Sequence, residues 1–515
     1  MSVLNSMYRL LFGFWILCFF SCENQQINTN KNSDKFNILF IVADDLNCDL
    51  GTYGNDLVHS PNIDSLASKG FQFDNAHCQY PHCGPSRASM MTGMYSDQTK
   101  INQNNIYLRS TVPDVITLSQ RFKQQGYHAI RIGKIFHLDN PGTIGTSGID
   151  DIYSWSHTIN PYGRDKIDEH LIKSLAPRRY GGTLSWLKAD GYDREQTDGI
   201  AADEAIEQLE KLSKSGDNFF LALGFVRPHL PFVAPSKYFD YYDIDDINIP
   251  KLEDDYLSSL PLPAIQSIRS RDLQLNLQDS ISKEIKQAYL ATVSFVDSQV
   301  GRVLNKLEET GLDKNTIVVF TSDHGFHLGD HGHWQKQTLF ETSTRVPLIF
   351  YVPNSLGSNI STNIPVELID IYPTLLDLVD ISAPKYLSGN SLKEIINQSS
   401  YKHKGSALTK WSSGYSIKTK RYRFTCWGDN GDLGYELYDH LYDQGELNNL
   451  ANDPIYNDVF DSLKLVINTR IIQSREKPLG IGRQFEGVTP IHTPRVVTYG
   501  DIHDLDGNIT YYKNE

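Results

Sequence analysis

The sequence is poor in cysteine and has no excess of positive charge. Only six of its 515 residues are cysteines, so disulfide bonds do not carry the stability of a chain this long. Lys and Arg number 48 against 62 Asp and Glu, which gives a formal net charge of −14. Such a chain has no general field that attracts nucleic acid, so we expect no nucleic-acid partner. An anionic substrate would need a local group of cations or a bound metal ion.

An apolar run near the N-terminus is too short to span a bilayer comfortably. Arg9 precedes this run over residues 10–20, and a small residue, Cys22 and a polar stretch follow. The order predicts a secretory signal peptide over 1–22 and a polar linker over 23–35. Cys22 also resembles the cysteine of a lipoprotein cleavage box, so lipidation and ordinary cleavage both stay open. Either route predicts export, to the periplasm or as a membrane-anchored lipoprotein.

Strands and helices alternate through residues 36–400, the predicted catalytic domain. Continuous apolar runs, typical of strands buried on both faces, occupy residues 37–42, 219–223, 317–321 and 348–352. Helical patterns lie between them, the clearest over residues 289–307, and Thr197 or Asp198 is suited to cap another helix. The alternation predicts an α/β fold with a large mixed, mostly parallel sheet flanked by helices.

The pattern changes after residue 400. Residues 415–427 alternate and are rich in Tyr, Thr and Arg, and residues 435–438 form another strand-like run. They predict a smaller antiparallel sheet. With a helix over about 455–471, this sheet would form a C-terminal α+β subdomain over 401–515.

Acidic side chains end two of the predicted strands. Asp44 and Asp45 follow the first apolar run, and Asp323 with His324 follows the third. Adjacent carboxylates repel each other unless a cation lies between them, and a hard divalent ion suits such a pair. Either pair alone would also suit a solvated turn or a structural histidine. Because ligands gather at the carboxyl ends of strands in open α/β sheets, the two pairs together predict one shared metal site.

One short segment carries the most specific motif of the chain. From Cys83 it runs Cys-Gly-Pro-Ser-Arg-Ala-Ser-Met-Met-Thr-Gly. It resembles the signature of type I sulfatases, with Met91 in place of the usual Leu. In that family an activating enzyme oxidises the cysteine to formylglycine, so the resemblance implies that Cys83 becomes the nucleophile. The segment from Gly126 to His137 resembles the second signature of the family, with Ala129 where Ser or Thr is usual.

Formylglycine at position 83 suits the hydrolysis of sulfate esters. Its aldehyde hydrates to a geminal diol, one hydroxyl of which attacks sulfur, and the other lets the sulfated intermediate collapse back to the aldehyde. Pro85 and Ser86 are start signals for a helix, whose N-terminal N–H groups would favour an anion near Cys83. The alternative interpretation of Cys83 is a structural thiol before a helix.

The resemblance also implies which residues complete the site. Arg87 lies one helical turn after the cysteine and would help to hold the diol or sulfate, as would Lys134 and His137. His229 lies between two prolines and is the predicted general acid for a poor alkoxide leaving group. Lys336 is suited to bind a sulfate oxygen as a point charge.

Within the family, three features most resemble the iduronate-2-sulfatases: the step from Lys134 to His137, the Arg-Pro-His-Leu-Pro-Phe loop and the Asp-His-Gly motif. The likeness implies an alkaline-phosphatase-like fold and a sulfated oligo- or polysaccharide substrate that carries a 2-O-sulfated uronic acid or related sugar. It also implies a calcium ion held by Asp44, Asp45, Asp323, His324 and residue 83 as formylglycine. The polar, glycine-rich residues 140–195, which we expect to form loops over the active face, can reshape the pocket.

Two other functions stay open. A phosphoester or phosphonate hydrolase of the same superfamily would share the metal-binding face. A non-catalytic surface lipoprotein would bind a sulfated glycan with an unconverted cysteine. Two further histidines, His331 and His333, are placed by the sequence either in the pocket or on the surface.

Overall fold

The computed structural model describes residues 35–176, 180–253, 255–398 and 403–491, and the described residues from Phe36 onward form one compact unit. The predicted signal peptide with Cys22, and the linker up to residue 34, lie outside the described residues. Within the described residues, no helix combines the length and apolar character needed to cross a bilayer.

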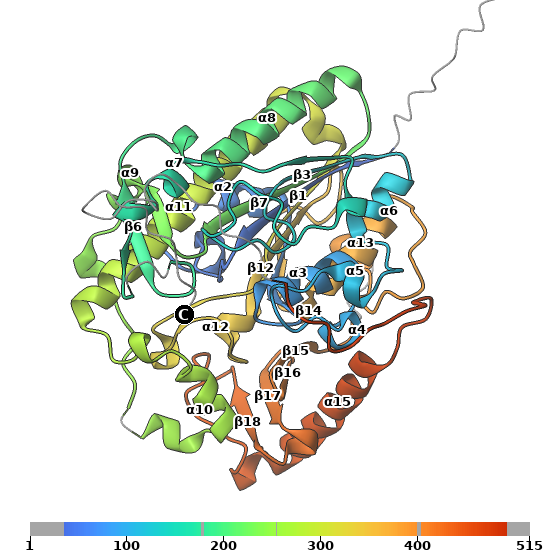
Figure 1. Cartoon of the computed structure of the whole chain (residues 1–515). Helices are drawn as coiled ribbons and strands as arrows, with labels where there is room; N and C mark the ends of the chain where they lie inside the picture. The colour runs from blue at the N-terminus through green and yellow to red at the C-terminus, as the bar shows by residue number, and fades with distance from the viewer. Residues whose placement is uncertain (1–34, 177–179, 254, 399–402, 492–515) are drawn as a thin grey trace, which may run out of the picture. The chain divides into compact units, whose positions relative to one another are not determined.

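A large mixed sheet forms the centre of this unit (Figure 1). Its strand order is β13-β2-β12-β9-β1-β7-β3-β4, with β14 beside β2. The pairs β1–β7, β1–β9, β3–β7 and β3–β4 are parallel, whereas β12 runs antiparallel to β9 and β2. The predicted mixed, mostly parallel sheet is therefore confirmed. The strand bounds are β1 (Asn37–Asp44), β2 (Phe71–His77), β3 (His128–Gly133), β4 (His157–Ile159), β7 (Phe219–Pro228), β9 (Thr316–Ser322), β12 (Arg345–Tyr351), β13 (Ile360–Thr362) and β14 (Val366–Glu367).

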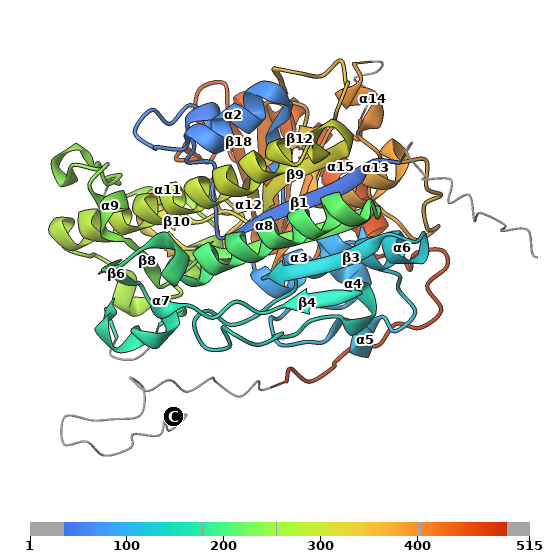
Figure 2. The same cartoon turned by 90° about the horizontal axis from the view of Figure 1, so that it is seen from above.

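Helices cover both faces of this sheet, because its central strands are apolar on both sides (Figure 2). Leu39 and Ile41 of β1 belong to one core with residues of α2 (Pro61–Lys69), α8 (Thr197–Ser215) and α11 (Asp279–Glu309). Alternate residues of β1 belong to a second core with α3 (Cys83–Thr92), α6 (Leu118–Gln124) and α13 (Ile371–Leu378). This alternation explains why the strand is a continuous apolar run.

The C-terminal part contains the predicted antiparallel sheet. The strands β15 (Ala407–Trp411), β16 (Gly414–Lys418), β17 (Tyr422–Trp427) and β18 (Gly434–Asp439) pair in chain order. The helix α15 (Asn457–Arg475) packs on them through a separate apolar core, which includes Phe424, Leu437 and Ile467. The predicted domain boundary near residue 400 stays a prediction, since residues 399–402 are not described.

Residues 140–195 contain more regular structure than the predicted loops. Besides β4, they include α7 (Arg164–Ile167) and the strands β5 (Lys173–Ser174) and β6 (Ser185–Ala189). β6 pairs with β5 and with β8 (Phe232–Pro235), the strand that follows the predicted general acid. The segment is therefore tied to the active-site edge by hydrogen bonds. The remaining short elements are α4 (Ser96–Thr99), α5 (Leu108–Thr111), α9 (Ser236–Phe239), α10 (Leu262–Ile268), α12 (Glu341–Thr344), α14 (Lys393–Ile396), β10 (His327–Leu328) and β11 (Trp334–Gln335).

The prediction that Thr197 or Asp198 caps a helix is wrong. The helix α8 starts at Thr197 after Gln196, whose side chain makes no capping hydrogen bond, and the N–H of Thr197 donates to Oδ1 of Asp165 instead. The carboxylate of Asp198 instead accepts hydrogen bonds from the backbone N–H groups of Val226 and Arg227, at 2.8 and 2.9 Å. Asp198 therefore fixes the end of β7, directly before the loop that carries His229.

Candidate active site

Two strand ends and one helix start meet at Cys83. Asp44 ends β1, Asp323 and His324 follow β9, and Cys83 opens α3. The Sγ atom of Cys83 lies 3.3 Å from Nε2 of His324 and 4.0 Å from Oδ1 of Asp45. All five side chains are buried. The structure thus brings together the four predicted metal ligands and the residue predicted to become formylglycine.

Arg87 joins two of the predicted ligands. Its Nε donates to Oδ2 of Asp323 at 2.8 Å and its Nη2 to Oδ1 of Asp44 at 2.9 Å, while Nη1 donates to the carbonyl oxygens of Lys134 and Ile135. The guanidinium is fully buried, and so are both carboxylates. Arg87 therefore orders the ligands in this structure, and its predicted contact with the diol or sulfate stays a prediction.

Two lysines hold the adjacent aspartates. Nζ of Lys134 lies 2.5 Å from Oδ2 of Asp44, and Nζ of Lys336 lies 2.5 Å from Oδ1 of Asp45 and 3.2 Å from Sγ of Cys83. Burial by itself would raise the pKa of Asp44, but Lys134 and Arg87 hold that pKa well below its usual range. The ammonium of Lys336 is therefore within reach of an anion at residue 83, and that of Lys134 lies against the predicted ligand Asp44.

The backbone fixes which nitrogen of each histidine faces the site. Nδ1 of His324 lies 3.0 Å from the carbonyl oxygen of Gly325, and Nδ1 of His229 lies 2.6 Å from that of Leu230. We assign the proton to Nδ1 in both rings, because a carbonyl oxygen only accepts. Nε2 of His324 then faces Cys83 with a lone pair, and Nε2 of His229 lies 3.8 Å from Oδ2 of Asp45.

His137 is held by an acid that the sequence analysis did not select. Its Nε2 lies 3.0 Å from Oδ1 of Asp139. Burial would lower the pKa of His137, but Asp139 and Cys83 together raise it above its usual value. The only sequence signal was the position of Asp139 two residues after His137, a spacing that carries no specificity by itself.

The residues present fit a hard divalent cation. Three carboxylates, from Asp44, Asp45 and Asp323, converge with one imidazole, that of His324, and carboxylate oxygens are the ligands that calcium prefers. Oδ2 of Asp45 is buried without a hydrogen bond. Burial also raises the pKa of Asp45, although Lys336 lowers it. A cation beside Asp45 would satisfy this oxygen and keep the carboxylate ionised.

Comparison with known proteins assigns the family. The model of the sulfatase family matches residues 36–381. A second family model, described as N-sulphoglucosamine sulphohydrolase, C-terminal, matches residues 329–473. This chain belongs to the sulfatase family. The enzyme is accordingly a sulfuric ester hydrolase.

Curated relatives of this sulfatase match most of their own length. A sulfatase of Formosa agariphila is 34% identical over 478 residues, covering 90% of this chain and 92% of the relative. Human iduronate 2-sulfatase is 32% identical over 520 residues, covering 84% and 93%. Among solved structures, the phosphonate monoester hydrolase of Agrobacterium radiobacter superposes with a TM-score of 0.73 at 20% identity, covering 85% and 96%. The last likeness establishes the shared alkaline-phosphatase-like fold alone.

The backbone of the sulfatase is strained on both sides of Lys336. Gln335 and Gln337 have φ values of 88° and 76°, in the left-handed region that non-glycine residues rarely adopt. Such residues cost of order 1–3 kcal/mol each and persist where the surroundings enforce them. Here Nε2 of His333 lies 3.0 Å from the carbonyl oxygen of Lys336, and Nε2 of Gln335 donates to that of Gly182. This anchoring aims the side chain of Lys336 at Cys83.

The predicted surface position of His331 and His333 is wrong, since both are buried, and their position in the pocket stays a prediction. His331 is buried against the ring of Phe340, with centroids 3.8 Å apart, and its Nδ1 is hydrogen-bonded to the hydroxyl of Tyr256. Both ring nitrogens of His333 face backbone carbonyl oxygens, those of Ile268 and Lys336. Both histidines are therefore structural, because tertiary packing buries the polar segment that carries them.

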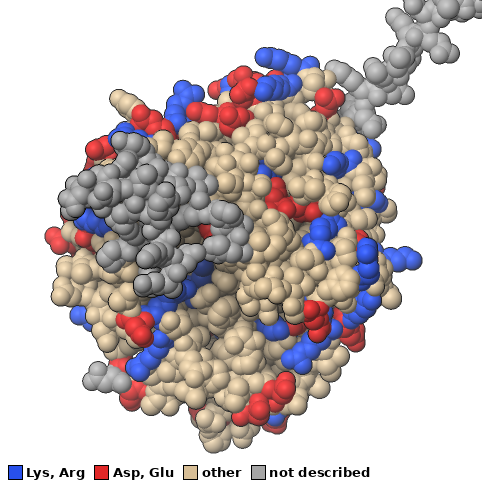
Figure 3. All heavy atoms as spheres, in the orientation of Figure 1, with Lys and Arg blue, Asp and Glu red and all other residues tan. Residues whose placement is uncertain are grey.

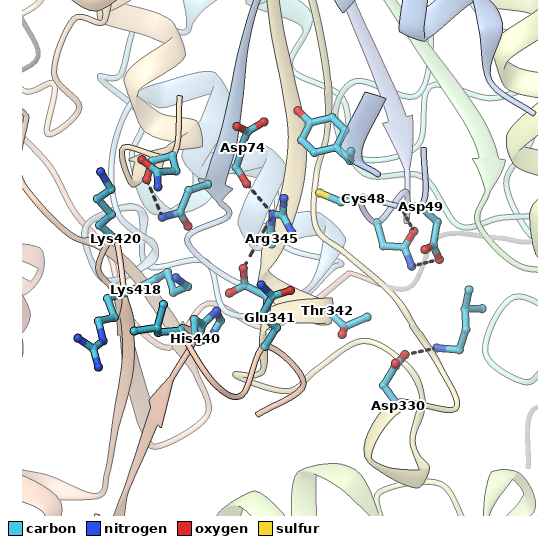
Figure 4. Close-up of a pocket in the computed structure, with 18 of the residues that line it drawn as sticks. Cys48, Asp49, Asp74, Asp330, Glu341, Thr342, Arg345, Lys418, Lys420 and His440 are labelled. Carbon is cyan, nitrogen blue, oxygen red and sulfur yellow. Dashed lines mark hydrogen bonds and ion pairs between the residues drawn. The ribbon is translucent and has the colours of Figure 1, made fainter. Parts of the chain in front are cut away.

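A separate cavity of about 900 Å³ contains none of the predicted catalytic residues (Figure 4). Its thiol, that of Cys48, has a pKa raised to about 12 by burial, so it is neutral and a poor nucleophile. Among its cations, Arg421 pairs with Asp439 at 2.6 Å and Arg345 donates to the carbonyl oxygen of Asp74 at 2.6 Å. This cavity therefore offers no activated nucleophile, and we place the chemistry at Cys83.

Charges of both signs alternate over the described surface on the face seen in Figure 3. No broad basic patch covers the described part of that face, in agreement with the net charge of −14.

Proposed function

We propose that this sulfatase hydrolyses sulfate esters of a sulfated carbohydrate through a formylglycine made from Cys83. One observation carries the proposal: residue 83 lies at the start of α3, within 3.3 Å of both His324 and Lys336 and beside three buried aspartates. A structural thiol has no need of a nearby ammonium and a group of carboxylates. The contacts support a nucleophile that is aligned and charge-stabilised.

The proposed substrate is a 2-O-sulfated uronic acid or related sugar within an oligo- or polysaccharide. The sequence identity of 32% to human iduronate 2-sulfatase, in an alignment that covers 84% of this chain, supports this choice. The motifs that carry the predicted ligands and the general acid fall inside the matched segment of the family model, which supports the sulfatase chemistry.

In the proposed reaction, one hydroxyl of the residue 83 diol loses its proton to water, its oxygen attacks sulfur, and the bond from sulfur to the sugar oxygen breaks. His229 gives a proton to the leaving sugar oxygen. The remaining hydroxyl of the diol then loses its proton to His229, which restores the acid, and the intermediate collapses to the aldehyde and expels sulfate. A water molecule hydrates the aldehyde and restores the diol, so the net change is one water consumed per ester.

The charged residues divide this work. Lys134 and Lys336 hold the sulfate oxygens. His137, which Asp139 orients, binds the diol. Burial and the charges of Lys336 and Lys134 keep the pKa of His229 well below its usual value. The negative charge of a bound sulfate ester would offset those lysines and favour the protonated imidazole that this step requires.

We further propose that calcium is the bound metal, held by Asp44, Asp45, Asp323, His324 and residue 83. When bound, it would supply positive charge that orients the diol and stabilises its ionised form. Arg87 would keep two of these carboxylates in place without the metal as well, since the guanidinium donates hydrogen bonds directly to them.

A screen of defined sulfated oligosaccharides tests the proposal. The protein is produced with a formylglycine-generating or sulfatase-maturating enzyme, the proposed partner, and peptide mass spectrometry measures the conversion of residue 83. We expect sulfate release that scales with the converted fraction. Parallel assays with phosphate and phosphonate esters of the same alcohols test the rival hydrolase. Faster turnover of the phosphorus esters would favour that rival, and glycan binding without any turnover would favour the lipoprotein.

Export is the remaining proposal. We infer that residues 1–22 direct the chain to the periplasm or, with Cys22 lipidated, to a membrane. This segment has a charged residue, then an apolar run, then small residues, and this order supports the inference. Fractionation of cells that express the full chain, with a Cys22→Ser variant as the control, separates soluble export from a lipid anchor.

A further inference from the structure

Arg271 is a half-buried cation without an acidic partner among the described residues. It follows α10, and its guanidinium donates to the carbonyl oxygen of Gly182 at 3.2 Å and to Oε1 of Gln337 at 3.3 Å. Other buried arginines of this chain pair with carboxylates: Arg131 with Asp150, Arg227 with Asp165, Arg423 with Glu446 and Arg470 with Glu367. Arg271 departs from this rule, and burial lowers its pKa.

Arg271 is tied to both flanks of Lys336. Gln337, its hydrogen-bond acceptor, directly follows Lys336. Gln335, directly before Lys336, donates to the same Gly182 oxygen as Arg271, at 3.2 Å. The guanidinium therefore belongs to the same anchored segment as the ammonium that contacts Cys83.

From this placement we propose that Arg271 binds a second anionic group of the substrate, a carboxylate or another sulfate, on or next to the sugar that carries the ester to be cleaved. The inference rests on the proposed function. A guanidinium has five N–H donors, of which two are used here, and the rest suit the two oxygens of one anionic group. A substrate anion would supply the counter-charge that the described protein residues do not.

This subsite explains how an acidic enzyme selects a doubly charged sugar. Lys134 and Lys336 neutralise the reacting sulfate, and Arg271 would neutralise the second group at a fixed position relative to it. Since Gly182 anchors Arg271, the segment 140–195 takes part in specificity by holding this guanidinium rather than by touching the reacting sulfur.

The test compares Arg271→Gln with Arg269→Gln, an exposed arginine two residues away that serves as the matched control. Four substrates are used: a 2-O-sulfated uronate disaccharide, its carboxyl-reduced form, a carboxyl-reduced form with a second sulfate, and an aryl sulfate. We expect Arg271→Gln to lower kcat/KM by about 10- to 100-fold, mainly through KM, on substrates with the second anion. Whether the carboxylate or the second sulfate shows this loss identifies which group is bound.

On the two substrates without a second anion, we expect Arg271→Gln and wild type to agree within about 2-fold, and Arg271→Lys to recover part of the loss on the others. An equal loss on all four substrates would mean a structural role and overturn the proposal, as would an unchanged kcat/KM throughout. If wild-type protein with converted residue 83 cleaves none of the four, the proposed function fails, and this outcome is distinct from a failure of Arg271.

Discussion

Nε2 of His324 lies 3.3 Å from the Sγ atom of Cys83, although 241 positions separate the two residues in the chain. The contact exists because β9 is hydrogen-bonded to β1 and both strands end at the edge of the sheet where α3 begins. It places a ligand-type nitrogen against the atom that maturation would replace. The predictions below follow from this arrangement.

Replacement of Cys83 by Ala should abolish turnover, with a loss of at least about 10⁴-fold in kcat, because the nucleophile is removed. The fold should survive, since the side chain becomes smaller at one buried position. Sulfate release and circular dichroism measure the two effects. The matched control is Cys48→Ala, a half-buried cysteine outside the site, which should retain activity. Hydrolysis by the Cys83 variant would exclude the proposed mechanism.

Removal of the metal should inactivate the enzyme and lower its thermal stability, because three buried carboxylates lose a neutralising cation. Asp323→Asn should weaken calcium binding, seen as a smaller rise of Tm on addition of calcium. Asp313→Asn, at a half-buried residue near the opposite end of β9, serves as the control. Full activity after metal analysis has verified its removal would refute the site.

Loss of His229 should lower kcat more for substrates whose leaving alcohol has a higher pKa. His229→Ala should lower kcat by about 10²- to 10⁴-fold on a sugar sulfate, whose alkoxide needs a proton, and by far less on a nitrophenyl sulfate. The measurement is the slope of log kcat against leaving-group pKa for wild type and variant. Parallel slopes would show that His229 is not the general acid.

The orientation of His137 should depend on Asp139. Asp139→Ala removes the hydrogen bond of 3.0 Å to Nε2 and should lower kcat by about 10-fold, by analogy with the loss of an orienting partner elsewhere. Asp139→Asn should recover part of it, because the amide oxygen still accepts the hydrogen bond. Unchanged kcat and KM in Asp139→Ala would show that Asp139 does not position His137.

Stability should fall with rising pH through the titration of Glu436. Burial raises the pKa of this carboxyl from 4.5 to about 7, although Tyr438 and Trp427 donate hydrogen bonds to it. The folded state therefore binds a proton more tightly than the unfolded chain, and this stabilisation is complete below pH 4.5 and lost as the pH rises through 7. The shift corresponds to at most about 3 kcal/mol.

Glu436→Gln should remove that dependence, so its Tm relative to wild type should rise by a few degrees between pH 5 and pH 8. Scanning calorimetry at both pH values measures the difference. The exposed Glu207→Gln should show no such change. A constant difference between Glu436→Gln and wild type would mean that Glu436 is ionised in the folded protein at both pH values.

Much of the fold was predictable because it follows from short-range pattern. The run at 37–42 is apolar at every position since β1 faces a core on each side, and the helix over 289–307 is amphipathic since one face of α11 packs on the sheet. The structured parts of 140–195 were missed because β6 pairs with β8, about 45 residues further along the chain, and its own residues give no sign of that partner.

The sequence by itself determined the family to which the chain belongs, and it supplied the motifs on which the proposed chemistry rests: the signature from Cys83 and the acidic strand ends at Asp44 and Asp323. Only the tertiary structure decided which residues surround and position these groups. It showed that Asp139 orients His137, that His331 and His333 are structural, and that Arg271 lacks an acidic partner among the described residues. The reason is physical: a motif records residues that must be close in the chain, whereas burial and charge pairing depend on which distant segments the fold brings into contact.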